Sequence, residues 1–353
     1  VEHKRDVVIL LDEPESLLPG QVLEVEILAG AEPVSGAARA AHVPAPTPSA
    51  IRDMILPASL LQRTRFEPSG LVWVPQLLRY VVVSDDTGQR GLDEHAPWLF
   101  TMDRRGQVDP SPLLIKGAEQ INDLESIATG KGGALFILSS QSLSRKGKRP
   151  ETRRQFARLT QGVDGYHLAE SIDLYGVLES LNAEELSSLG ITSLENLDIE
   201  GMTAFKEGLL LGLKAPLDKD GNALVWRLER PAVLLAGGST QDAGLSLWNR
   251  VSVKLHADDA LVPGGISELL SLPDGSLMFA ATASEGDPNR QDGSLWWAAA
   301  PEGKSPVMAR RLEEFRDLKP EGLAVSPTPG RIVVTFDRGS KTPKWAERSR
   351  PTR

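Results

Sequence analysis

The chain has 353 residues, of which 41% are hydrophobic and 25% charged, so it can bury a large core, and its length alone permits two or three domains. A formal net charge of −9 disfavours general nucleic-acid binding, because a protein that neutralises phosphates needs a net or concentrated positive face. The absence of cysteine excludes disulfides, a thiolate nucleophile and cysteine-bound metals. No apolar run approaches the roughly 18 residues of a membrane span, which predicts a soluble chain. Because the sequence starts at Val1 rather than Met, the compartment stays open: periplasmic or secreted if a leader was removed, and cytoplasmic otherwise.

The first part of the chain, residues 1–65, matches no repeat. It contains two strand-like runs, at residues 7–11 and 22–28. A connection rich in proline and alanine follows at residues 31–48, and residues 49–61 predict a short helix.

From residue 66 onward five stretches share one pattern: a turn-like anchor, a short apolar strand, a turn marked by glycine or proline, and a second apolar strand. This pattern predicts a β-hairpin in each repeat, most clearly at residues 198–204 with 209–213. Further strands are predicted at residues 98–102, 156–159, 223–228 and 294–299. In the second repeat, the insertion at residues 168–189 has a cap-like start at Asn182 and predicts a short helix.

Aligning the anchors produces one column of equivalent positions: Ser69, Glu125, Glu200, Ser267 and Glu321. The column recurs at intervals of roughly 54 to 75 residues, as in propeller blades of antiparallel strands that carry loop insertions. We therefore predict an all-β protein, a β-propeller with five blades, and keep six blades as the alternative because residues 1–65 could hold a degenerate one. The N-terminal strands would complete the last blade and leave no open sheet edge. The expected organisation is residues 1–65 completing the ring, residues 66–340 as propeller repeats, and residues 341–353 as a basic polar tail.

Three passages of the repeats carry a family resemblance: residues 69–71 with 83–86, residues 198–201 with 211–216, and residues 319–323 with 336–337. Together they resemble the esterase-like phytase and SdiA-regulated group of bacterial propellers, and are most similar to an uncharacterised sister family without an assigned function. The resemblance covers residues 66–340 and implies a propeller fold. It also implies a group in which some members are calcium-dependent phosphoesterases. The chain departs from this pattern where Ser69 and Ser267 replace the acid of the column, so a full acidic ring is absent.

The acids of the column are candidate metal ligands. The innermost strand of each blade lines the axis of a propeller, so Glu125, Glu200 and Glu321 would meet at one mouth of the central channel. Asp123 and Asp198, two residues earlier than their glutamates, could add ligands. Gathered carboxylates repel one another unless a cation compensates, and hard oxygen ligands suit Ca2+ or Mg2+. The alternative is that each acid caps its own blade by accepting backbone N–H groups, and the sequence leaves both open.

Two surface loops are candidate substrate-binding segments. The loop after the first hairpin carries Asp85 and Asp86, although Asp-Asp-Thr-Gly is also ordinary turn chemistry. The loop at residues 139–158 is rich in cations, and arginine suits bidentate contacts to phosphate. Its cations are Arg145, Lys146, Lys148, Arg149, Arg153, Arg154 and Arg158. The alternative is a solvated charged loop without a ligand.

No catalytic motif is complete. The five histidines are scattered, which argues against zinc, and no Gly-x-Ser-x-Gly elbow occurs. Residues 218–222 begin like a calcium loop, but the position of the glycine favours a hairpin turn.

Two functions stay open. We favour a scaffold that binds a ligand or partner, which would be an anionic small molecule or another protein. The alternative is a divalent-metal-dependent phosphoesterase or related hydrolase that acts on an anionic substrate at the channel mouth. Convergence of the glutamates and the basic loop on one face would favour the enzyme.

Overall fold

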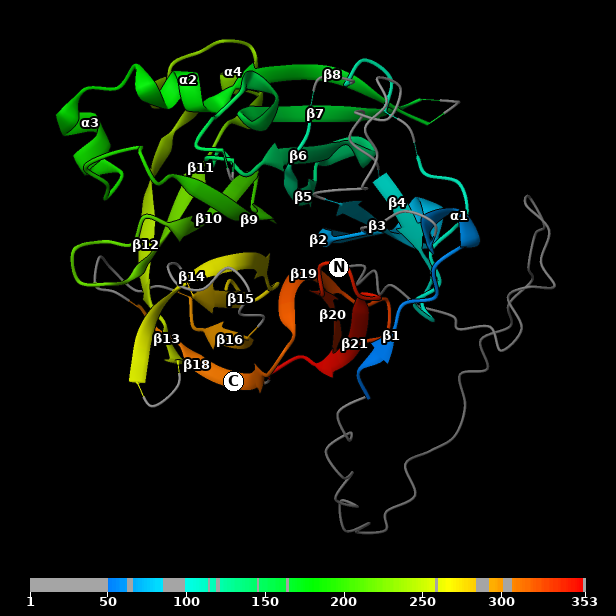
Figure 1. The fold of residues 1–353 in the computed structure, drawn as a ribbon. Coiled ribbons are helices and arrows are strands. Elements are labelled where there is room, and N and C mark those ends of the chain that lie inside the picture. The colour runs from blue at the N-terminus through cyan, green and yellow to red at the C-terminus, as the bar shows by residue number, and fades with distance from the viewer. Residues whose placement is uncertain are drawn as a thin grey trace, which may run out of the picture. The chain divides into compact units, whose positions relative to one another are not determined.

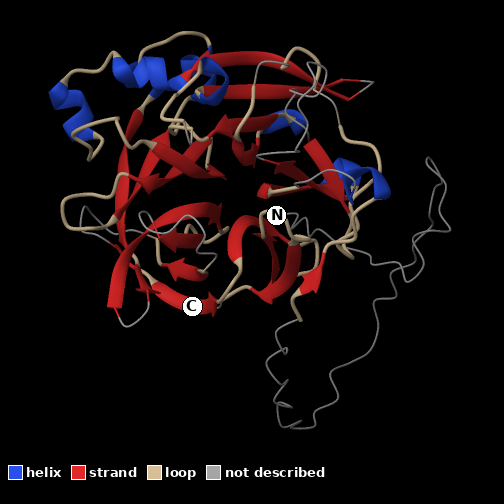
Figure 2. Cartoon of the chain, viewed as in Figure 1, coloured by secondary structure: helices blue, strands red, loops and turns tan. Residues whose placement is uncertain are grey.

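The computed structural model describes residues 50–61, 66–84, 99–113, 115–118, 121–144, 146–162, 165–257, 260–283, 292–300 and 307–351. These residues form five sheets arranged around a central axis, so the fold is a five-bladed β-propeller (Figure 1). Strands dominate, and the helices are short and lie at the periphery (Figure 2). The predicted all-β class and the five blades are confirmed. No helix in the described ranges is long and apolar enough to cross a membrane.

Each blade begins at the axis with its innermost strand, and the strands follow here from the axis outward. Blade 1 contains β2 (Pro68–Val74), β3 (Arg79–Ser84) and β4 (Leu99–Met102). Blade 2 contains β5 (Leu124–Thr129), β6 (Leu135–Ser139), β7 (Gln155–Gly162) and β8 (Gly165–Asp173). Blade 3 contains β9 (Asp198–Phe205), β10 (Gly208–Ala215), β11 (Ala223–Leu228), β12 (Leu245–Ser252) and the parallel β17 (Val307–Met308).

The last two blades follow the same order. Blade 4 contains β14 (Ala260–Ser271), β15 (Leu277–Ala283), β16 (Gly293–Ala298) and β18 (Arg310–Phe315), with β13 (Lys254–Ala257) paired to the start of β14. Blade 5 contains β19 (Lys319–Val325), β20 (Arg331–Asp337), β21 (Lys344–Ser349) and β1 (Arg52–Asp53).

An N-terminal strand closes the ring. Arg52 and Asp53 of β1 pair with Trp345 and Lys344 of β21, so one blade joins the two ends of the described chain. The strand-like runs at residues 7–11 and 22–28, to which the sequence assigned this role, lie outside the described residues.

The prediction of a basic polar tail at residues 341–353 needs correction, because Lys344–Ser349 forms β21 of blade 5. Trp345 and Ala346 are buried, and Arg348 is buried with them. The guanidinium of Arg348 binds Glu313 of β18 through two contacts, Nε to Oε2 at 2.6 Å and Nη2 to Oε1 at 2.9 Å. The carboxylate of Glu313 on the neighbouring blade thus neutralises the charge of Arg348. In the sequence alone this charge suggests a residue exposed to solvent.

The helix predicted at Asn182 is confirmed as α3 (Ala183–Ser188). The Asn182 side chain accepts the N–H groups of Glu184 and Glu185, and the Glu185 side chain accepts that of Asn182, which forms a capping box. The predicted turn at residues 218–222 is also present, with Asp218 accepting the N–H groups of Asp220 and Asn222. The other helices are α1 (Ala58–Leu61), α2 (Leu174–Glu179), α4 (Pro231–Leu235) and α5 (Thr240–Ala243), with short 3-10 helices at Pro75–Leu77, Lys131–Gly133 and Glu151–Arg153.

Each of the five apolar cores lies between two neighbouring blades. Every innermost strand contributes one large apolar side chain, two positions after its column residue: Leu71, Ile127, Met202, Leu269 and Leu323. All five are at most 2% exposed, and burying a side chain of this size stabilises a fold by about 1.5–3 kcal/mol. Because the cores lie between blades, each blade is held against its neighbours around the ring.

Candidate functional site

The five column positions are five equivalent β-bulges. In each innermost strand the pairing to the next strand skips one residue. The skipped residues are Ser69, Glu125, Glu200, Ser267 and Glu321. A bulge bends its strand and re-aims the side chain of the extra residue. The repeated bulge therefore gives these side chains equivalent places at one mouth of the channel.

Glu200 and Asp198 lie within electrostatic range of each other in this mouth. Glu200 is 4% exposed, and its Oε1 accepts a hydrogen bond of 2.6 Å from Nζ of Lys214 on β10. The second oxygen, Oε2, is buried and has no hydrogen-bond partner among the described residues. Oδ1 of Asp198 is buried and unpartnered within the same ranges. Two carboxyl groups thus each offer one oxygen that no described residue bonds.

The two carboxyl groups differ in electrostatic environment. Burial, reinforced by the charge of Glu200, raises the pKa of Asp198 to about 7, while Lys214, Lys319 and Arg153 act in the opposite direction. Burial disfavours the charge of Lys214, but Glu200, Asp198 and Glu321 together raise the pKa of the lysine above its usual value, so it stays charged. At neutral pH Asp198 is therefore partly protonated beside a lysine-bound Glu200.

Glu321 provides the third acid of the mouth. It forms an ion pair with Lys319 on the same strand, and burial raises the pKa of Glu321 to about 8 despite this partner. Burial disfavours the Lys319 ammonium, but the charges of Glu321, Glu200 and Glu125 outweigh it and raise the pKa of Lys319 well above its usual value. All three glutamates therefore lie within electrostatic range of one ammonium group, and their role as metal ligands stays a prediction.

Asp123 joins this cluster from blade 2. Its backbone lies in the left-handed region at φ 56°, which aspartate tolerates better than most residues. Oδ1 of Asp123 lies 2.5 Å from Nη1 of Arg153, and Oδ2 accepts a hydrogen bond from the Ser140 hydroxyl. The backbone N–H of Ile199 donates to the Ser140 carbonyl at 2.8 Å, so this part of blade 2 is tied to the strand that carries Asp198.

Glu268 is a buried acid that the sequence did not single out. It follows the bulge of β14, and the equivalent residues of the other blades are Gly70, Ser126, Gly201 and Gly322. Its Oε1 accepts from the N–H groups of Leu269 at 2.8 Å and Met202 at 3.3 Å, and from the Ser126 hydroxyl at 3.4 Å. The side chain of blade 4 thus reaches blades 2 and 3 across the axis. The signal in the sequence that could have identified Glu268 is that the four equivalent positions hold small residues.

The basic loop is divided between packing and the mouth. The guanidinium of Arg149 lies 4.0 Å above the ring of Tyr175, and its Nη2 donates to the Glu195 carbonyl at 2.7 Å. Arg154 binds Asp173 with Nε to Oδ1 at 2.8 Å, so both arginines fasten the loop to α2 and its surroundings. The remaining predicted residues have other positions: Arg153 reaches the mouth, Arg158 pairs with Glu170, Lys146 and Lys148 are exposed, and Arg145, Asp85 and Asp86 lie outside the described residues.

The predicted metal site has no ligand set within the part of the chain that the structure describes. No group of three or more histidine or acidic side chains there is arranged to hold a metal ion. Asp123, Glu200 and Glu321 each contact an arginine or a lysine instead, and a hard divalent ion is bound by oxygen ligands that are not neutralised in this way. Glu200 accepts no backbone N–H bond from a described residue. The Ca2+ or Mg2+ site stays a prediction.

Comparison with known proteins gives similarity of structure only. No protein-family model matches the chain, and no curated protein sequence matches it. An exo-β-1,3-galactanase from Phanerochaete chrysosporium is similar with a TM-score of 0.46 and 10% identity, over 86% of this chain, which spans 64% of the galactanase. A glutaminyl cyclase from Myxococcus xanthus has a TM-score of 0.43 and 14% identity over 87% of this chain and 97% of the cyclase. An endo-arabinase from Bacteroides thetaiotaomicron has a TM-score of 0.46 and 10% identity over 85% of this chain and 98% of the arabinase. Function therefore has to be argued from the residues of the site.

Proposed function

We propose that the protein is a hydrolase whose substrate binds at the mouth formed by the five bulges. One observation carries the proposal: Asp198 and Glu200 are close, largely buried carboxyl groups in different environments, and each has an oxygen without a partner in the described chain. Pairs of neighbouring acids in unlike environments are typical of general acid–base catalysis.

The two groups have complementary roles in the proposed reaction. Glu200, paired with Lys214, accepts a proton from the attacking water. Asp198, partly protonated at neutral pH, donates a proton to the leaving oxygen of the substrate. The water oxygen forms the new bond as the bond to the leaving oxygen breaks. Transfer of the proton from Glu200 to Asp198 then restores the starting state.

The cations of the mouth bear on the substrate class. Lys214, Lys319 and Arg153 lie among the acids, and such groups can orient an anionic part of a substrate. The resemblance to phytase-like propellers makes phosphate monoesters the first anionic class to test. Esters and glycosides, which two carboxyl groups can also hydrolyse, form the uncharged classes.

The test is a panel of p-nitrophenyl phosphates, esters and glycosides, measured with and without a chelator. We expect hydrolysis of one class, and a loss of at least about a hundredfold in Glu200→Gln and Asp198→Asn. Asp220→Asn is the matched control, because Asp220 is 62% exposed and pairs with the exposed Lys219 instead of a group of the mouth. Unchanged rates in both site variants would overturn the acid–base assignment.

A chelator separates the metal-dependent alternative from this mechanism, because a metal-dependent enzyme loses activity in the chelator and the proposed acid–base enzyme does not. A ligand that binds the wild type at this mouth, depends on Glu200 and is never hydrolysed would support the binding scaffold instead. Folding of each variant is checked by thermal unfolding, so that a lost rate is not a lost fold.

A further inference from the structure

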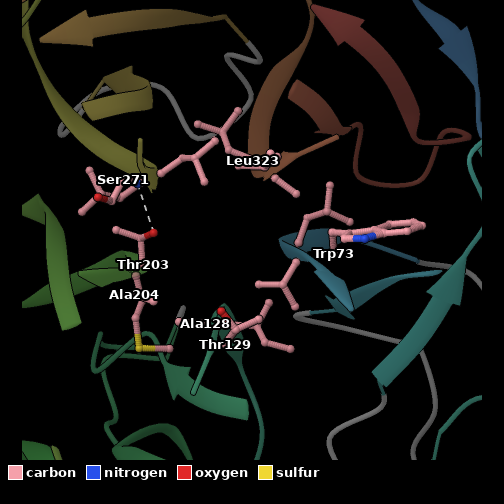
Figure 3. A pocket seen from close by; sticks show the side chains of 15 residues that line it. Trp73, Ala128, Thr129, Thr203, Ala204, Ser271 and Leu323 are labelled. Carbon is pink, nitrogen blue, oxygen red and sulfur yellow. Dashed lines mark hydrogen bonds between the residues drawn. The ribbon is translucent and has the colours of Figure 1, made fainter. Parts of the chain in front are cut away.

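A second opening lies at the other end of the innermost strands. It is a cavity of about 230 Å³ lined by the second, third and fourth residues after the bulge of all five blades (Figure 3). Leu71, Ile127, Met202, Leu269 and Leu323 form its apolar floor. Ala128, Ala204 and Ala324 add small side chains to the lining.

The cavity is separated from the acidic mouth by the first residue after each bulge. At this level the innermost strands approach closely: a Cβ at Gly70 would lie 3.0 Å from Cα of Ser126, and one at Gly201 would lie 3.0 Å from Cβ of Leu269. Glu268 crosses the axis at the same level, with its hydrogen bonds to Met202 and Ser126. The channel is therefore narrowed between two openings of different chemistry.

Its lining has no ionisable acid or base. None of the fifteen residues that line the cavity in the described chain is aspartate, glutamate, lysine, arginine or histidine. Its polar side chains are the hydroxyls of Thr129, Thr203 and Ser271, together with the indole N–H of Trp73. Oγ1 of Thr203 accepts the Ser271 N–H at 3.1 Å, which leaves the hydroxyl hydrogen for another acceptor (Figure 3).

We propose that this cavity binds an uncharged, mainly apolar small molecule that carries a hydroxyl or carbonyl group at one end. An apolar cavity of about 150 Å³ is enough to bind benzene, so a cavity of 230 Å³ fits a molecule of one to two rings. Burying an ion here would cost free energy, because no opposite charge lines the cavity. Trp73, held edge-on against Tyr80 at a centroid distance of 4.9 Å, provides a fixed aromatic edge.

The test compares 2-naphthol with 2-naphthoate, which has the same rings and a negative charge. Saturation-transfer NMR and calorimetry at pH 7 should show that 2-naphthol binds and that 2-naphthoate binds at least tenfold more weakly. Ala204→Phe fills the cavity from the half-buried end of β9 and should weaken 2-naphthol at least tenfold. Ala232→Phe makes the same change on the exposed side of α4 and should leave binding unaltered.

Three results would overturn the proposal: no binding of 2-naphthol, equal binding of 2-naphthoate, or unchanged binding of 2-naphthol by Ala204→Phe. If Ala204→Phe does not fold, Thr129→Trp replaces it, because Thr129 lies on the rim, is exposed and tolerates a larger side chain. This test uses no substrate of the acidic mouth, so its outcome is independent of the proposed hydrolase.

Discussion

The carboxyl group of Glu268 should make the protein's stability depend on pH in a way that a single substitution removes. Glu268 is 1% exposed, and burial raises its pKa well above the usual value, although the N–H groups of Leu269 and Met202 act in the opposite direction. Glu268→Gln keeps the size and the acceptor oxygen of the side chain and removes only its ionisation. Any difference in pH dependence between the two proteins therefore reports on this one proton.

The sign follows from proton linkage. A carboxyl group with a raised folded pKa contributes most to the free energy of unfolding below the unfolded pKa of about 4.3. This contribution falls as the pH rises toward the folded pKa, by up to about 1.4 kcal/mol per pH unit. Glutamine does not titrate, so the free energy of unfolding of Glu268→Gln should rise relative to wild type between pH 5 and pH 8. Urea unfolding followed by tryptophan fluorescence measures both proteins at each pH.

Two further variants separate ionisation from hydrogen bonding. Glu195→Gln removes an exposed carboxyl group and should show no comparable trend. Glu268→Leu leaves the N–H groups of Leu269 and Met202 without their acceptor, and each costs about 1–3 kcal/mol at every pH. A constant difference between wild type and Glu268→Gln from pH 5 to pH 8 would refute the reasoning, because it would mean that the buried carboxyl ionises like an exposed one.

Three other predictions concern the acidic mouth. Lys214→Met leaves Glu200 buried without its cation and should lower the free energy of unfolding by about 3–5 kcal/mol in a urea titration, whereas the exposed Lys219→Met should change it by less than about 0.5 kcal/mol. Calorimetric titration of Ca2+ into chelator-treated protein tests the metal site: binding that is lost in Glu200→Gln supports it, and no binding to the wild type rejects it. For any substrate that is hydrolysed, kcat/KM should fall as the pH rises through about 7, where Asp198 loses its acidic proton, and a rate that is constant to pH 9 would contradict that role.

The fold could be predicted from the sequence because each repeat contains the same local pattern. The innermost strand of each blade carries the same bulge, which adds one residue to the strand, so the positions from Ser69 to Glu321 recur as one column in the sequence. β21 was missed because its charges look solvated until Arg348 meets Glu313 on another blade. A contact between distant segments of the chain leaves no local pattern.

The site could be predicted only in part, because its contacts also join distant segments of the chain. The convergence of the acids followed from the repeat, but their partners Lys214, Lys319 and Arg153 come from positions without a common motif. These cations decide whether a carboxyl group is a metal ligand or a titratable acid. The packing role of Arg149 in the basic loop could not be predicted for a related reason. The aromatic ring and the carbonyl that hold this arginine lie in the helical insertion.

A single strand pattern, repeated five times, produces two openings of different chemistry. The bulge positions carry the acids, the next positions are small in four blades and allow the strands to close, and the positions after them are apolar. Where the innermost strands approach closely, they limit the access of water to the acids from the side of the cavity. Loss of water is the largest cause of the raised pKa of Asp198 and Glu321. The small residues and Glu268 therefore act on both sides: they separate the apolar cavity from the acidic mouth, and they maintain the low-dielectric surroundings on which the proposed acid–base chemistry depends.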